Sequence, residues 1–94
     1  MIPLSVPHFE GHEEKYVCDA VGQGWVSTGG AYVERLEKAV AEYSGASGSV
    51  ACQSGTAALH MALIEAGVKE NDLVIAPTLT FIAAVHPITH VHAD

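Results

Sequence analysis

Residues 49–77 read SVACQSGTAALHMALIEAGVKENDLVIAP, and the order of patterns in this stretch decides the expected fold. Residues 49–53 and 73–76 are short, mostly apolar runs, which are typical of strands buried on both faces of a parallel sheet. Between them, residues 57–66 have the composition of a helix that follows a Ser-Gly-Thr turn and ends at Gly67. A strand, a crossover helix and a second strand form the repeating unit of α/β proteins.

Two further helical patterns precede this stretch, in residues 12–21 and 31–43. Gly45 is expected to end the second of these helices. Ser27 or Thr28 is available to cap its beginning. The order helix, helix, strand, helix, strand, helix predicts an α/β fold with a mainly parallel sheet.

Two predicted strands are too few for a stable parallel sheet, whose strands need neighbours and cover on both faces. We therefore interpret the chain as the opening of a larger α/β domain. Residues 1–47 would supply N-terminal helices and a loop, and residues 48–94 the first β-α-β-α of the sheet. A truncated product, or a piece completed by a second chain, is the alternative. Residues from Phe81 to Val85 look helical, but Pro87 would break a helix interior, so the last part of the chain stays ambiguous.

The charge of the chain excludes several classes of partner. Its 94 residues carry 4 Lys and Arg against 11 Asp and Glu, a formal net charge of −7. Nucleic acids and anionic membrane surfaces both require clustered cations, so neither is an expected partner. No apolar run approaches the ~20 residues of a membrane-spanning helix. The beginning, residues 1–4 (MIPL), lacks the basic and apolar regions of a secretion signal, and we expect a cytoplasmic protein.

The apolar content predicts association with more protein. Hydrophobic residues make up 49% of the chain, and the mean hydropathy is +0.25. A domain this small leaves much of its surface exposed, so such a composition favours an oligomer. Cys18 and Cys52 lie outside any CxxC spacing and are expected to be reduced, small core residues.

Three histidines near the end of the chain have a spacing that could bind Zn²⁺. His86, His90 and His92 form an HxxxHxH pattern, and the first two would share one face of a helix. Pro87 disrupts the helix that would align them. Solvated histidines are therefore the default interpretation, and a metal site stays an open alternative.

The turn at residues 52–59 (CQSGTAAL) carries the clearest chemical signal. Where a helix follows a strand directly, the free N–H groups of its first turn and the positive end of its dipole point at one place. Gly55 has no Cβ to block a close approach, and Thr56 adds a hydroxyl group. This arrangement suits a phosphate, although neither a Walker loop nor a dinucleotide fingerprint is present. Since Ser and Thr are also favoured at helix starts, a simple cap is the alternative.

Six short motifs, in this order and spacing, resemble the N-terminal portion of a known enzyme family. They are Ile2–Leu4, Gly24–Gly30, Val33–Glu37, Ser54–Leu59, Gly67–Val68 and Ala76–Ala83. Over essentially all 94 residues the chain is similar to the sugar aminotransferases that use pyridoxal phosphate. These enzymes are a branch of the fold-type I (aspartate aminotransferase-like) superfamily. The chain looks most like members that act on nucleotide-linked amino- or keto-sugars of bacterial surface glycans.

The resemblance implies a cofactor site. In the family, the Gly-Thr-Ala turn holds the phosphate of pyridoxal 5′-phosphate, which here implies Gly55, Thr56 and Ala57. The aromatic residue after the second strand stacks on the pyridine ring, which implies Phe81. A flat apolar ring suits that role, and packing under the next helix is the alternative for Phe81.

The resemblance also implies an activity and a partner. The complete enzyme would move an amino group, usually from glutamate, to a keto-sugar nucleotide, and would act as a homodimer. Trp25 lies in a loop that resembles the segment near the active-site mouth and the partner subunit.

The family's catalytic lysine and the carboxylate that faces the pyridine nitrogen lie beyond residue 94 in the family. Lys15, Lys38 and Lys69 match no such motif, so we expect no catalytic residue and no transamination by this chain alone. Another fold-type I activity, such as a lyase or dehydratase, is one alternative. A non-catalytic fragment that acts by association is the other.

Overall fold

The structure is a computed structural model that describes residues 2–3, 5–25 and 27–94. Met1, Leu4 and Val26, which belong to segments quoted above, lie outside the described residues. The chain divides into two compact units, Met1–Ser49 and Val50–Asp94, which we call the N-terminal and C-terminal units. Each unit is described by itself below.

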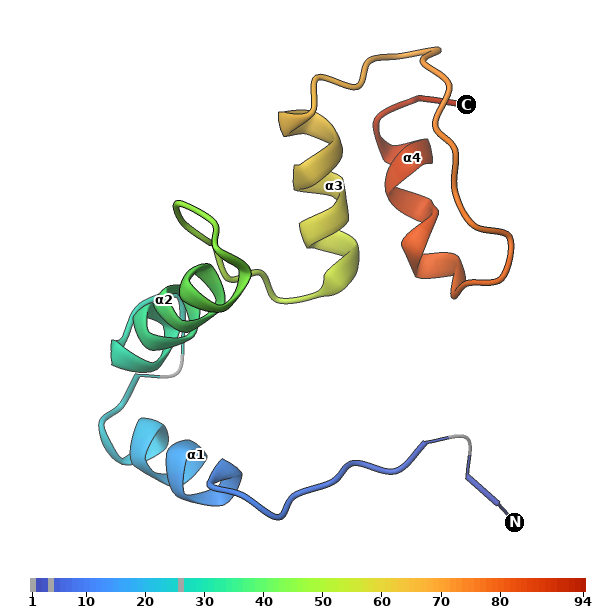
Figure 1. Cartoon of the computed structure of the whole chain (residues 1–94). Coiled ribbons are helices and arrows are strands. Elements are labelled where there is room, and N and C mark those ends of the chain that lie inside the picture. The colour runs from blue at the N-terminus through green and yellow to red at the C-terminus, as the bar shows by residue number, and fades with distance from the viewer. Residues whose placement is uncertain (1, 4, 26) are drawn as a thin grey trace. The chain divides into compact units, whose positions relative to one another are not determined.

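The N-terminal unit contains two helices, α1 (Glu13–Gly22) and α2 (Ala31–Ser44) (Figure 1). Both helices predicted in this region are confirmed, with boundaries that differ by one residue. The predicted stop of α2 is confirmed as well, because Gly45 adopts a left-handed φ of 72°. Its conformation lets the Ala46 N–H donate to the Ala41 carbonyl at 3.1 Å, which satisfies one of the last carbonyls of the helix.

The beginning of α2 differs from the prediction. Gly30 occupies the N-cap position and no side chain caps this helix, so the cap predicted for Ser27 or Thr28 is wrong. Gly30 has a φ of 129°, which disfavours other residues. A Cβ at this position would lie 3.0 Å from the Trp25 Cβ, so the Trp25 side chain needs the space that the glycine leaves.

Polar and aromatic side chains join α1 to α2. Tyr32 Oη of α2 donates a 2.6 Å hydrogen bond to Asp19 Oδ2 of α1, and Gln23 Nε2 donates to the same oxygen at 2.8 Å. The Arg35 guanidinium carbon lies 5.2 Å from the ring centroid of Tyr16 and 5.4 Å from that of Tyr32. The Tyr32 hydrogen bond, followed by that of Gln23, lowers the pKa of Asp19. The same bond to Asp19 raises the pKa of Tyr32.

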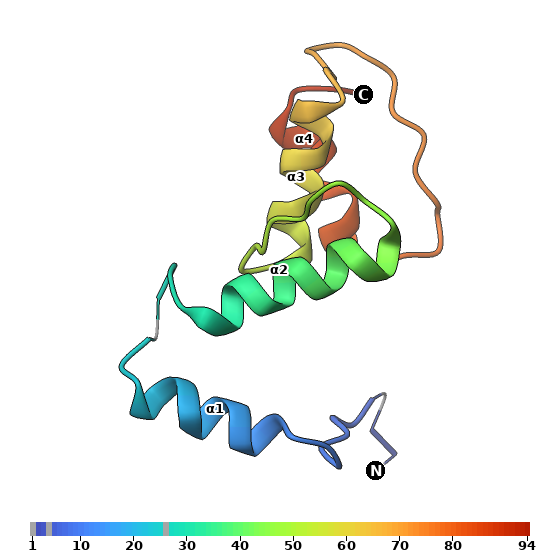
Figure 2. The same ribbon diagram turned by 60° about the vertical axis from the view of Figure 1, so that its left-hand side comes forward.

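The C-terminal unit contains α3 (Gly55–Glu65), the short 3-10 helix η1 (Ile82–Ala84) and α4 (His86–His90). α3 packs against both η1 and α4, and α3 and α4 lie side by side in Figures 1 and 2. The sequence left this region ambiguous, and the structure forms two short helices there. The expectation that Pro87 disrupts a helix containing His86 and His90 is wrong, because Pro87 lies in the first turn of α4. A proline is tolerated there, since its missing N–H would have no intrahelical acceptor.

The predicted sheet is not confirmed. The described residues contain no β-strand, so the strands predicted for residues 49–53 and 73–76 are not formed here. A strand depends on a ladder of backbone hydrogen bonds to a neighbour that another part of the protein must supply. Its absence in the described part of the chain is a correction to the α/β prediction for these 94 residues.

One segment shows the beginning of such a ladder. The Asp94 N–H donates to the Asp72 carbonyl at 2.9 Å, and the Val74 N–H donates to the Asp94 carbonyl at 2.7 Å. Asp94 therefore forms hydrogen bonds with the residues on either side of Leu73, which is the pattern of two neighbouring parallel strands. Residues 72–74 and 92–94 therefore run in parallel, with η1 and α4 between them in the sequence.

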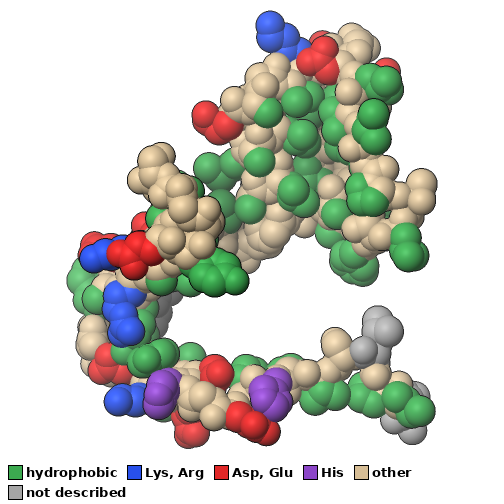
Figure 3. All heavy atoms as spheres, in the orientation of Figure 1, with side chains coloured by type: hydrophobic (Ala, Val, Ile, Leu, Met, Phe, Trp, Pro, Cys, Tyr) green, Lys and Arg blue, Asp and Glu red, His purple; other side chains and the backbone are tan. Residues whose placement is uncertain are grey.

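Very little of the chain is buried. It exposes 8092 Å², whereas a compact protein of 9.8 kDa exposes about 5,200 Å². Within the described part of the chain, the buried side chains are those of Ala93 and Pro87. Ile75 and Leu79 are 93% and 97% exposed, and hydrophobic side chains gather on the visible face of the C-terminal unit (Figure 3).

The exposed apolar surface also corrects the interpretation of the cysteines. Both thiols are free, but Cys18 is exposed on α1 and Cys52 is only half-buried. Neither can be a core residue where so little core is formed. Among the described helices, none is long and apolar enough to cross a membrane.

Candidate functional site

The sequence predicted a phosphate site at the turn in residues 52–59, and in the structure this turn leads into the start of α3. Ser54 has an extended backbone (φ −156°, ψ 155°) and occupies the N-cap position. Its Oγ accepts a hydrogen bond of 3.2 Å from the Ala57 N–H. The first helical bond runs from the Ala58 N–H to the Ser54 carbonyl at 3.1 Å. The helix thus begins at Gly55, two residues earlier than predicted. The helix cap that the sequence analysis kept as an alternative interpretation is formed by Ser54.

The cap uses only one of the three amides in the first turn. Because Ser54 takes the Ala57 N–H, the amides of Gly55 and Thr56 remain without a hydrogen-bond partner in the part of the chain that the structure describes. Amides at this position in a helix have no intrahelical acceptor. The cap and the anion site are therefore compatible, since they use different N–H groups.

Gly55 leaves open space beside these amides. A Cβ at this position would meet no atom within 4 Å, and the φ of Gly55 lies outside the left-handed region. Neither its backbone conformation nor protein packing therefore requires a glycine here. A glycine at the first helical position leaves the approach to the Gly55 and Thr56 amides clear for an external group.

The charged side chains of the C-terminal unit belong to the other end of α3. Residues 43–64 contain no Asp, Glu, Lys or Arg, and neither do residues 73–93. The charged residues of this unit are Glu65, Lys69, Glu70, Asp72 and Asp94. Figure 3 shows acidic and basic side chains toward the end of the unit at which α3 finishes. No carboxylate in the first turn of α3 therefore opposes an anion.

Phe81 precedes η1, which packs against α3. Phe81 is 79% exposed. η1 and the first turn of α3 lie at the same end of the C-terminal unit in both ribbon views (Figures 1 and 2). Stacking of Phe81 on a cofactor stays a prediction.

The histidines gather across two helices but provide no set of three metal ligands in the described part of the chain. The rings of His60 and His90 have centroids 5.3 Å apart, and those of His86 and His90 are 6.2 Å apart. His92 has a φ of 57°, which turns the chain out of α4. Among the described residues, no group of three or more His, Cys, Asp or Glu is arranged to hold a metal ion.

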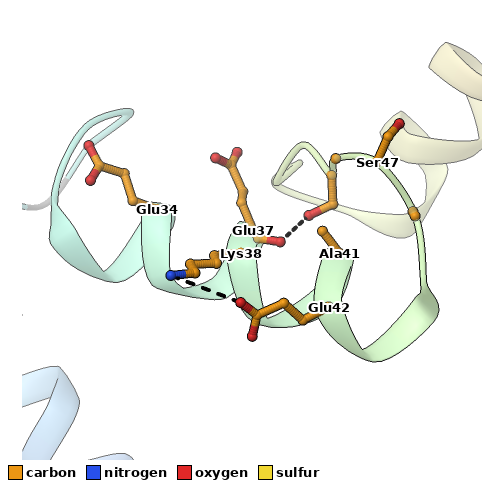
Figure 4. Close-up of a pocket in the computed structure, with 9 residues that line it drawn as sticks. Glu34, Glu37, Lys38, Ala41, Glu42 and Ser47 are labelled. Carbon is orange, nitrogen blue, oxygen red and sulfur yellow. Dashed lines mark hydrogen bonds and ion pairs between the residues drawn. The ribbon is translucent and has the colours of Figure 1, made fainter.

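A hollow of about 450 Å³ beside α2 was not anticipated from the sequence. Residues 46–49 fold back along α2, where Ser49 Oγ donates a 2.6 Å hydrogen bond to the Glu37 carbonyl (Figure 4). Glu34, Glu37 and Glu42 line it, and Lys38 Nζ lies 3.9 Å from Glu42 Oε1. In the sequence, the one feature that could have indicated this hollow is the spacing of these glutamates before a Gly- and Ser-rich loop. The carboxylates make the hollow unsuitable for a phosphate.

Comparisons with known proteins identify the family of the chain. The chain matches the model of the DegT/DnrJ/EryC1/StrS aminotransferase family over residues 7–94, and it therefore belongs to that family. It is 38% identical over 89 residues to a GDP-perosamine synthase of Caulobacter vibrioides, and 39% identical over 89 residues to a Bacillus subtilis protein named as the putative pyridoxal phosphate-dependent aminotransferase EpsN. It is also 33% identical over 88 residues to a UDP-4-amino-4-deoxy-L-arabinose–oxoglutarate aminotransferase of Shewanella sediminis.

These matches cover 94–95% of the chain but only 22–24% of each relative. The chain thus spans about a quarter of the length of the curated relatives it matches. The predicted membership in the aminotransferase family is confirmed. The resemblance implied pyridoxal 5′-phosphate as the cofactor of the complete enzyme. The family match and the name of the Bacillus subtilis relative confirm this cofactor.

Proposed function

We propose that this chain is the N-terminal part of a pyridoxal-phosphate aminotransferase that acts on a keto-sugar nucleotide, and that the start of α3 holds the cofactor phosphate. The observation that carries the phosphate role is the pair of unpartnered amides at Gly55 and Thr56, next to the space that Gly55 leaves open. Membership in the aminotransferase family supports the activity. The names of two relatives, which refer to GDP- and UDP-linked sugars, support the substrate class.

The residues at this site would bind and orient the cofactor. The Gly55 and Thr56 amides donate to phosphate oxygens, and the Thr56 hydroxyl adds a further hydrogen bond. The dipole of α3 places its positive end at the same anion. Phe81 offers a flat, exposed face for the pyridine ring. When bound, the cofactor supplies an electron-accepting ring for the transfer of the amino group.

Several finer features belong to the same proposal. We expect glutamate as the amino donor, bacterial glycan synthesis as the role, a homodimer as the assembly and the cytoplasm as the location. The parallel hydrogen bonds between residues 72–74 and 92–94 support a parallel sheet in the complete protein. The exposed apolar side chains, among them Ile75 and Leu79, support burial against further protein.

The proposal is tested with the ¹⁵N-labelled 94-residue chain, inorganic phosphate and pyridoxamine 5′-phosphate. Both ligands are expected to shift the Gly55 and Thr56 amide resonances and to saturate. Gly55→Val should weaken binding at least tenfold, because the new side chain occupies the space next to the free amides. Gly48→Val is the matched control, since a Cβ at Gly48 also meets no atom within 4 Å and lies outside the turn.

If the wild type and Gly55→Val bind these ligands with equal affinity, the turn acts only as a helix cap and the phosphate role is rejected. An assay of the complete protein with a keto-sugar nucleotide and glutamate, followed by the formation of 2-oxoglutarate, tests the activity itself. Absence of the aminated sugar in that assay would favour another fold-type I activity.

A further inference from the structure

We propose that His60 of α3 and His90 of α4 together bind one divalent cation of the zinc class, with water in the remaining coordination positions. The inference does not depend on the function proposed above, because it uses neither the turn at the start of α3 nor Phe81. It also differs from the HxxxHxH pattern of the sequence, because His60 takes the place of His92. Only the packing of α3 against α4 brings His60 to His90.

The separation of the two imidazole rings is the first observation. The ring centroids of His60 and His90 lie 5.3 Å apart. Two imidazoles that each place a nitrogen ~2.0–2.1 Å from one tetrahedral Zn²⁺ have ring centroids about 5 Å apart. The ring planes are inclined by 63°, so the rings are not stacked face to face. The spacing therefore suits a shared ion between the ring edges, which carry the nitrogens.

The ring nitrogens are also available. Within the described residues, neither ring takes part in a hydrogen bond or an ion pair. A neutral imidazole has one nitrogen whose lone pair can bind a metal ion. His90 is exposed and His60 is half-buried, so the pair is open to an ion from solvent.

The surroundings select the class of ion. Residues 43–64 and 73–93 contain no Asp or Glu. In the three packed elements α3, η1 and α4, the one carboxylate is that of Glu65, the last residue of α3. Mg²⁺ and Ca²⁺ require several oxygen ligands, whereas imidazole suits Zn²⁺, Cu²⁺ and Ni²⁺. Two protein ligands leave positions that water fills, as it does in zinc sites that keep an open position.

Two other interpretations of these histidines make different predictions. His86 and His90 lie four residues apart on α4, a spacing that can also hold Zn²⁺. Their centroids are 6.2 Å apart, which is longer than the separation that a tetrahedral ion requires. Alternatively, the contact between His60 and His90 is only the edge-to-face packing of two rings, and then no ion binds.

The experiment is an NMR titration of the ¹⁵N-labelled 94-residue chain with zinc chloride at about pH 7.5, where the imidazoles are mostly neutral. The ring resonances of His60 and His90 are expected to shift together and to saturate at one ion per chain. His60→Gln and His90→Gln should each weaken binding at least tenfold, since even groups that only support a ligand contribute about that much.

His86→Gln is the matched control, because it removes an exposed imidazole from the same helix. Its affinity for Zn²⁺ should equal that of the wild type. Magnesium chloride should leave the ring resonances of His60 and His90 unchanged. At about pH 5, protons occupy the imidazoles and Zn²⁺ binding should be lost. Binding that persists at this pH would place the ion on carboxylates and overturn the proposal.

The wild type alone can also reject the proposal, even if a variant loses α3 in its circular dichroism spectrum. Rings of His60 and His90 that do not respond to Zn²⁺ would overturn it, including the case in which the ion binds Cys18 or Cys52. Equal losses in His60→Gln and His86→Gln would overturn the assignment of two ligands. Each of these failures would leave the proposed phosphate site untouched, because that site is measured at the Gly55 and Thr56 amides.

Discussion

Tyr32 Oη donates a 2.6 Å hydrogen bond to Asp19 Oδ2, and this bond joins α2 to α1 across 13 residues of sequence. Both helices are otherwise largely exposed, with no buried residue on either. The contact between them includes the rings of Tyr16 and Tyr32, but its hydrogen bond joins two ionisable groups, so we expect the strength of the contact to depend on pH.

The sign of this dependence follows from the two pKa shifts. The pKa of Asp19 is lowered, so its contribution is present above the ordinary value of about 3.9 and is lost as the pH falls through the lowered value. The pKa of Tyr32 is raised, so its contribution is present below about 10 and is lost as the pH rises through the raised value. We expect the α1–α2 contact to be strongest between about pH 5 and 9.

Tyr32→Phe should raise the pKa of Asp19 toward its ordinary value, although Gln23 still donates to the carboxylate. An NMR titration of the Asp19 carboxyl carbon measures this change. Tyr43→Phe is the control, because the Tyr43 side chain is 96% exposed and lies outside this contact. An Asp19 titration that is identical in the wild type and in Tyr32→Phe would contradict the contact.

Phe81→Ala should separate ring stacking from phosphate binding. Because Phe81 is 79% exposed, its truncation should change the thermal stability of the chain little. Affinity for pyridoxamine 5′-phosphate should fall several-fold through the loss of an aromatic contact of about 1 kcal/mol, while affinity for inorganic phosphate stays the same. Leu79→Ala, at a 97% exposed position, is the control. Equal losses for both ligands would argue against stacking.

Hydrogen exchange should reveal the parallel pairing at residues 72–74 and 92–94. The Val74 and Asp94 amides are hydrogen-bonded, so they should exchange more slowly than the neighbouring Ile75 amide. Asn71, with a φ of 65°, positions this segment. Asn71→Val should therefore accelerate exchange at Val74, whereas Asn71→Gly should not. Uniformly fast exchange at all three amides would mean that the pairing is not populated in solution.

The exposed apolar side chains predict self-association of the 94-residue chain. Ile75 is 93% exposed and Leu73 is 82% exposed, although both belong to an apolar run. We expect concentration-dependent sedimentation and binding of a dye that reports apolar surface. Replacing both residues by threonine should reduce each signal, whereas Lys15→Ala should leave them unchanged. A compact monomer without dye binding would contradict this expectation.

The helices could be predicted from the sequence because a helix forms its hydrogen bonds within one segment. The pattern of residues 31–43 and the glycine at position 45 predicted α2 and its end, and residues 12–21 predicted α1. The same local reasoning predicted that a helix follows the turn at residues 54–56, which α3 confirms with a start two residues earlier, and the anion site at this turn stays a prediction. The order of short motifs also predicted the aminotransferase family, which the match over residues 7–94 confirms.

The tertiary structure decided the features that depend on contacts between segments. Residues 49–53 and 73–76 have strand patterns, but a strand needs hydrogen bonds from a neighbour, and only residues 72–74 find the beginning of one. The Asp19–Tyr32 bond joins two helices, and no local pattern predicts which side chains meet there. At the candidate site, the sequence determined which residue types are present. The folded conformation decided that Ser54 engages the Ala57 amide and leaves the Gly55 and Thr56 amides free, because a hydroxyl group reaches only the donor that the backbone brings within about 3 Å.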